Sequence, residues 1–85
     1  MNLFLVNVVP NPSVNRMDMY KQFESLLSKD EQLREAVAVQ RTFKCMGRDE
    51  VHLVVRAENL IFLEQALSPF ERQAKIEVTP VVELT

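Results

Sequence analysis

The residues of this chain that could do chemistry gather around its only histidine, His52. This side chain lies in the apolar run Val51–Ala57, and histidine is the residue that ordinarily changes charge near neutral pH. Arg56 belongs to the same run, and in a strand both side chains project from one face. The pair predicts a site in which His52 is a general acid or base while Arg56 holds a substrate anion. The alternative is structural, with His52 satisfied at an interface and Arg56 paired with a glutamate of a neighbouring strand.

Three more residues are candidates for binding a substrate. Asn7 interrupts the otherwise apolar run Leu3–Val9, and a buried amide needs hydrogen-bond partners, which either a ligand or an interface supplies. Arg41 could join Arg56 in clamping a carboxylate, because a guanidinium fits planar anions. Tyr20 lies on an amphipathic stretch, where it lines either a cavity or the core.

The single cysteine, Cys45, excludes an internal disulfide and a zinc site made only of cysteines. Lys44 and Arg41 could favour its thiolate, but the chain has no second cysteine and no base adjacent to it, so we expect a small buried residue. Only carboxylates and Cys45 are left to join His52 around a metal ion. We therefore predict neither zinc nor iron, and no cofactor.

Composition and missing motifs exclude several classes of function. With one glycine, the chain has no glycine-rich phosphate cradle and no dinucleotide fingerprint. A net charge of −2 and the lack of base-stacking aromatic pairs in the apolar runs argue against nucleic acid. No apolar stretch reaches bilayer length, and the amino end lacks the positive start of a signal peptide. We expect one domain over residues 1–85, located in the cytoplasm, with no membrane partner.

Periodicity predicts strand, helix, strand, strand, helix and strand along the chain. The predicted elements are a strand at Leu3–Val9, a helix from Arg16 with a break near Ser28–Asp30, a short helical piece carrying Leu33 and Ala36, a strand near Ala38–Met46, a hairpin at Gly47–Asp49, a strand at Val51–Ala57, a helix opened by Glu58 or Asn59 and ended by Pro69, and a last strand with Ile76, Val78, Val82 and Leu84. At the break, Ser28 and Glu31 have the spacing of a capping box. In the second strand, alternation places Val39, Phe43 and Cys45 on one face.

This order of elements is the split βαβ pattern of the ferredoxin-like fold, a four-stranded antiparallel sheet with two helices on one face. The first and third strands have the strongest apolar runs, so we place them at the centre, and Pro80 in the last strand agrees with an edge position. Two helices cover one face only. The other face is predicted to hold Leu3, Leu5, Val54 and either Phe43 or Thr42, beside Asn7, His52 and Arg56. Because this uncovered face is apolar, we predict that the chain forms a homodimer or a higher homo-oligomer through it.

The carboxyl half carries two motifs that have a counterpart in a known family. After the hairpin glycine Gly47, they are the helix end Ala66-Leu67-Ser68-Pro69-Phe70 and the strand Ile76-Glu77-Val78-Thr79-Pro80-Val81. From Gly47 onward the chain resembles muconolactone-isomerase-like proteins of the dimeric α/β barrel superfamily. The resemblance implies a dimer whose cavities, between the sheet and its helices or loops, bind small organic acids, ring compounds or haem.

Two hypotheses about function follow from these observations. In the first, the chain is a small-molecule-binding protein of the dimeric α/β barrel type, and its enzymatic form is an isomerase that acts on a small organic anion by proton transfer at His52. In the second, it is a non-catalytic interaction or assembly module whose open sheet face joins copies or a partner.

Overall fold

The fold is one antiparallel sheet with helices on one side, as described by a computed structural model for residues 2–84. The elements are β1 (Asn2–Pro10), α1 (Arg16–Lys29), α2 (Glu31–Ala36), β2 (Val37–Lys44), β3 (Val51–Ala57), α3 (Leu60–Leu67), the 3₁₀ turn η1 (Ser68–Phe70) and β4 (Ala74–Val81). The strand order is β2-β3-β1-β4, and every neighbouring pair is antiparallel. This topology confirms the predicted ferredoxin-like fold, with the two most apolar strands at the centre.

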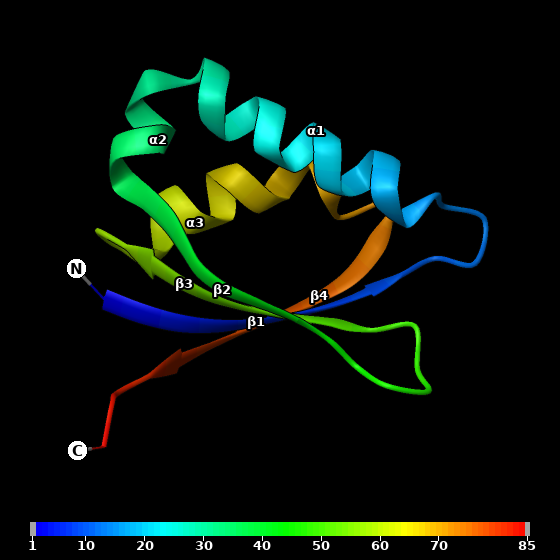
Figure 1. Ribbon diagram of the computed structural model, residues 1–85. Coiled ribbons are helices and arrows are strands. Elements are labelled where there is room, and N and C mark those ends of the chain that lie inside the picture. The colour runs from blue at the N-terminus through cyan, green and yellow to red at the C-terminus, as the bar shows by residue number, and fades with distance from the viewer. Residues whose placement is uncertain (1, 85) are drawn as a thin grey trace.

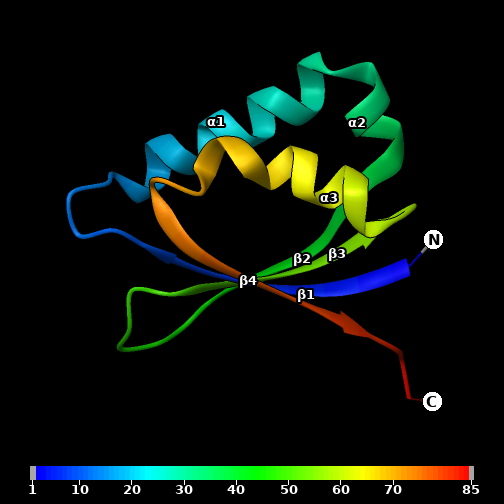
Figure 2. The same ribbon diagram turned by 180° about the vertical axis from the view of Figure 1, so that it is seen from behind.

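Helices α1, α2 and α3 lie on the same side of the sheet (Figure 1). The view from behind shows the same two layers, and no element of the described residues covers the far side (Figure 2). Each crossover leaves a central strand and returns to an edge strand, and crossovers of one hand place their helices on one face. The sheet therefore has a helix face, which is covered, and an open face, which is not.

Short polar side chains begin all three helices. The side-chain oxygen of Asn15 accepts from the Asp18 N–H at 3.1 Å at the start of α1. Asn59 does the same for α3. The predicted break between α1 and α2 is confirmed, but the predicted Ser28 capping box is wrong, because Asp30 caps α2. Asp30 can do so because its backbone is extended, whereas Ser28 still lies within α1.

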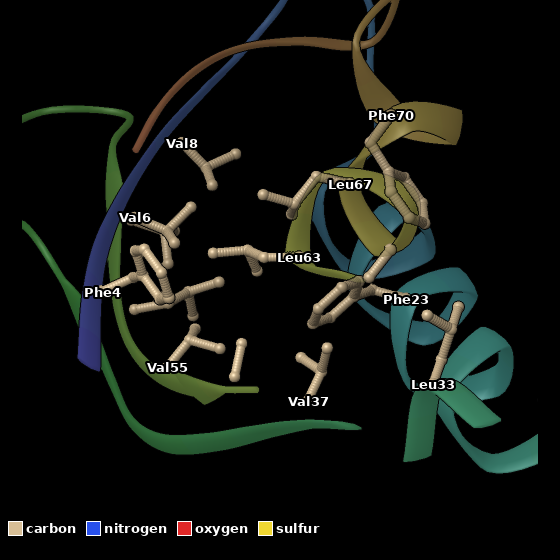
Figure 3. Close-up of a cluster of buried hydrophobic side chains, with 14 of the residues drawn as sticks. Phe4, Val6, Val8, Phe23, Leu33, Val37, Val55, Leu63, Leu67 and Phe70 are labelled. Atoms are coloured by element: carbon tan, nitrogen blue, oxygen red, sulfur yellow. The ribbon is translucent and has the colours of Figure 1, made fainter. Parts of the chain in front are cut away.

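The core fills the space between the helix face of the sheet and α1 and α3. Alternate residues of the central strands point into it, as the burial of Val6 and Val55 shows. Opposite them, Leu63 of α3 is fully buried at the centre of the cluster (Figure 3). Phe23 and Phe70 close the cluster with an edge-to-face contact, their ring centroids 5.7 Å apart.

The last strand is shorter than predicted. β4 ends at Val81, which pairs with Leu3, one residue after β1 begins. Beyond that point the chain does not pair with β1, and Val82 and Leu84 are 84% and 93% exposed and do not contribute to a strand face. None of the helices in residues 2–84 is long and apolar enough to cross a membrane.

The helix layer leaves strand β2 largely uncovered, and only Val37 of this strand is buried. A groove of about 430 Å³ separates α1 from β2, and Tyr20, Leu27 and Thr42 lie along it. Burial raises the pKa of the Tyr20 hydroxyl above its usual 10.0. The polar Thr42 side chain lowers this pKa in part, and the negative charge of Glu24 raises it further. The Tyr20 and Thr42 hydroxyls do not reach hydrogen-bonding geometry, so within residues 2–84 the phenol oxygen has no hydrogen-bond partner.

The packing predicts that two truncations on helix α3 lower the free energy of unfolding by very different amounts. We expect Leu63→Ala to lower the free energy of unfolding by about 2–5 kcal/mol, because it opens a cavity in the core. Ile61→Ala is the matched control, since Ile61 is 64% exposed, and we expect it to change stability by about 0.5 kcal/mol or less. Urea unfolding measures both values, and equal costs would contradict the described core.

Tyr20 predicts a loss of stability in alkaline solution. Its pKa is higher in the folded than in the unfolded state, so stability is unaffected below the unfolded value of 10.0 and falls as pH rises above it. Urea unfolding at about pH 8 and about pH 11 should show a larger alkaline loss for the wild type than for Tyr20→Phe. Tyr20 is the only tyrosine, so phenolate absorption also reports its pKa directly. Equal losses in the two proteins would contradict this placement.

Candidate functional site

Four of the five predicted site residues lie on the open face of the sheet. Asn7 and His52 are direct neighbours in the β1–β3 ladder, at the centre of the sheet. Arg41 pairs with Val54, and Arg56 lies further along β3 on the same face. The central strands and β2 therefore bring Asn7, Arg41, His52 and Arg56 to one surface.

Tyr20 lies apart from the other four residues. It belongs to α1, which covers the helix face, so the sheet separates it from Asn7 and His52. The five residues predicted to bind or act on a substrate do not form one site within a single chain. Substrate binding by Tyr20 stays a prediction. The periodicity of a helix indicates that a residue faces the sheet, but it does not show on which face of the sheet a ligand would lie.

A β-bulge decides which side chains of β2 reach the open face. Val39 pairs with Val55 on the helix face, whereas Arg41 pairs with Val54, and the register shifts between them. The predicted alternation, with Val39 and Phe43 on one face, is therefore wrong. The extra residue turns Arg41 and Phe43 to the open face, which simple alternation cannot predict.

The open face is apolar at its centre and unusually exposed at one edge. Leu3, Leu5 and Val54 are half-buried only by their neighbours in the sheet. Phe43 pairs with His52 and is 52% exposed. Large apolar side chains grouped on one surface are typical of a contact site.

Two buried polar atoms on this face have no hydrogen bond. Within residues 2–84, neither Oδ1 of Asn7 nor Nε2 of His52 has a partner. Nε2 of His52 lies 3.4 Å from Oε1 of Glu50, a contact that does not reach hydrogen-bond geometry. An unpaired buried polar group costs about 1–3 kcal/mol, so two neighbouring ones indicate that something outside the isolated chain pairs with them.

The two arginines of the open face have no ion-pair partner within residues 2–84. Both Arg41 and Arg56 are exposed. No carboxylate in the described part of the chain lies within ion-pair distance of either guanidinium. The predicted alternative, in which they pair with a neighbouring glutamate, is not formed there, and both remain available to an anion.

One group of residues escaped the sequence prediction. The ligand atoms of Cys45, Glu50 and His52 lie within 4.8 Å of one another at the end of the β2–β3 hairpin. The hairpin places Cys45 opposite Glu50, since the Cys45 N–H donates to the Glu50 carbonyl at 3.0 Å. The sequence did contain a signal for this group. Counting outward from the predicted turn at Gly47 pairs residues across the two strands, and it places Cys45 near Glu50.

No protein-family model matches the chain, and no curated protein matches it either. Solved structures do share its fold. Ribosomal protein S6 of the 30S subunit from Thermotoga maritima is 11% identical with a TM-score of 0.64, over 94% of this chain and 87% of that one. SCO4226 from Streptomyces coelicolor is 11% identical with a TM-score of 0.61, over 96% of this chain and 99% of that one.

A third structure, a conserved protein of unknown function from Bacteroides thetaiotaomicron described as a possible oxidoreductase, is 16% identical with a TM-score of 0.57. The alignment covers 94% of this chain and 96% of that one. At such identities the three likenesses show the fold alone. The finer resemblance to muconolactone-isomerase-like proteins stays a prediction.

Proposed function

We propose that this chain is a small-molecule-binding protein that works as a homodimer, in which two open sheet faces enclose a site for a small organic anion. The observation that carries the proposal is the pair of unpartnered buried atoms, Oδ1 of Asn7 and Nε2 of His52, at the centre of an uncovered apolar face. The resemblance of the carboxyl half to dimeric α/β barrel proteins agrees with the dimer, whereas the cavities that it implies lie between the sheet and its helices or loops.

A second copy is the occupant that suits this face. The β4 edge carries Glu77, which pairs with Asn7, while Arg41 and Arg56 lie on β2 and β3. A two-fold axis between the sheets and along the strands lays the β4 edge of one protomer over the β2 edge of its partner. This arrangement brings Glu77 to the β2 edge of the partner, where Arg41 lies, and it covers Leu5 and Val54. Lys75 lies on the same face of β4 as Glu77, so the β4 edge carries charges of both signs.

The chemical class of the ligand follows from the polar side chains that lie among the apolar residues of the open face. Arg41 and Arg56 offer unpaired guanidinium groups, which fit the planar geometry of a carboxylate. Asn7 adds an amide that can orient the ligand, and Val54 adds an apolar contact for its carbon skeleton. A small organic anion matches both features.

Catalysis by proton transfer at His52 stays a prediction, as does the cytoplasmic location. His52 is the one group of the face that ordinarily changes charge near neutral pH, and the Glu50 carboxylate beside it could orient its ring. The same contact favours the second function, a non-catalytic assembly module, because it gives His52 a structural neighbour. Ligand binding separates the two functions.

The dimer predicts a change of mass in one of two matched variants. We expect light scattering to give the wild type a mass close to twice the 9.9 kDa of one chain. Leu5→Glu should be monomeric, because it places a charge in the centre of the interface without touching the core. Ile61→Glu introduces the same charge on an exposed position of α3 and should stay dimeric. A monomeric wild type at tens of micromolar chain would refute the shared interface.

The ligand site predicts a loss of anion binding in the arginine variants. Native mass spectrometry with benzoate, phthalate and succinate as probes should detect binding of at least one probe to the wild-type dimer. We expect Arg41→Ala and Arg56→Ala each to weaken it about 10-fold or more, since each removes a charge-assisted hydrogen bond. Arg72→Ala, in the exposed segment before β4, is the control and should bind normally. A dimer that binds none of the probes would favour the assembly module.

A further inference from the structure

We infer that the end of the β2–β3 hairpin binds one divalent transition-metal ion of the Zn²⁺ type. The ligands are the Cys45 thiolate, a carboxylate oxygen of Glu50 and Nε2 of His52. All three belong to a single chain. The inference therefore goes beyond the proposed function and does not depend on dimerisation.

The spacing of the ligand atoms fits a tetrahedral ion. Nε2 of His52 lies 3.4 Å from Oε1 of Glu50, and the ligand atoms of all three residues lie within 4.8 Å of one another. With metal–ligand bonds of about 2.0–2.3 Å, a tetrahedral zinc ion holds neighbouring ligand atoms about 3.3–3.7 Å apart. The nitrogen and oxygen have this spacing already, and the Cys45 thiol needs to approach them by no more than about 1.5 Å.

The surrounding contacts leave these ligand atoms free for a metal ion. Nε2 of His52 is buried and has no hydrogen bond within residues 2–84. Cys45 is a half-buried free thiol with no second cysteine in the chain. Nε of Arg48 lies 3.6 Å from Oε2 of Glu50, so the carboxylate is oriented with its other oxygen, Oε1, toward His52.

The donor set selects the class of ion. Thiolate and imidazole ligands favour zinc and neighbouring transition metals over magnesium and calcium, which prefer oxygen. The negative charges of Cys45 and Glu50 balance a divalent cation, so its burial leaves no uncompensated charge. Three protein ligands leave a fourth position for water or an anion, as in catalytic zinc sites.

The hairpin that carries the ligands is held by a hydrogen bond between its strands and by an ion pair from its turn to α1. The Cys45 N–H donates to the Glu50 carbonyl at 3.0 Å, and Gly47 takes the positive φ of 79° that its turn requires. Asp49 forms an ion pair with Arg16 at the start of α1. The ligands are thereby held near their binding positions before an ion arrives.

Cobalt titration of the full, untagged chain tests the site, because Co²⁺ bound by a thiolate gives a charge-transfer absorption. We expect the wild type to bind one Co²⁺ per chain with this absorption, and Zn²⁺ to abolish it by displacement. Cys45→Ser should lose the absorption. Glu50→Gln and His52→Gln should weaken binding by more than the roughly 10- to 100-fold that the loss of an outer-shell partner costs.

Glu64→Gln is the matched control, since Glu64 is exposed on α3, on the other side of the sheet from the cluster, and should leave binding unchanged. Protection of Cys45 from alkylation by added Zn²⁺ tests the site in the wild type, even where a variant fails to fold. Absence of the charge-transfer absorption, or of this protection, would overturn the inference. Binding retained by His52→Gln, or lost by Glu64→Gln, would overturn it as well. A monomeric chain that binds metal would refute the proposed dimer and leave the metal site standing.

Discussion

The constraint on which the rest of this structure depends is the uneven cover of its sheet. Two crossovers of one hand place α1, α2 and α3 on the same face, and the buried core forms there. The central strands are apolar on both faces, because each also carries side chains such as Leu5 and Val54 toward the open side. No other helix or strand within residues 2–84 covers them. The candidate site residues Asn7, Arg41, His52 and Arg56 lie on the face that folding leaves open.

Much of the fold was predictable, because its elements obey local rules. Val51–Ala57 alternates buried and outward residues, and the strand has the predicted bounds. The errors arise where a contact with another strand or a backbone angle decides the outcome. Asp30 rather than Ser28 caps α2 because its backbone is extended. The pairing of β4 with β1 ends at Val81, so the predicted residues Val82 and Leu84 lie outside the strand.

The candidate site was predictable to the same degree. Asn7 and His52 stand out as polar exceptions in apolar runs, and the ladder places them side by side. Arg41 reaches the open face because of a β-bulge, which the sequence pattern did not predict. Tyr20 lies on α1, on the opposite side of the sheet. The grouping of Cys45 with His52 needs the pairing across a turn, so the residue types alone gave no reason to expect it.

The central claim is that the open face, with Leu3, Leu5 and Val54 at its centre, is where this protein meets a second copy of itself. Isotope-filtered nuclear Overhauser spectroscopy on a mixture of labelled and unlabelled chains tests it most directly. The account predicts contacts between chains that involve the methyl groups of these three residues. Contacts between chains that involve only helix residues such as Ile61, or none at all, would contradict it.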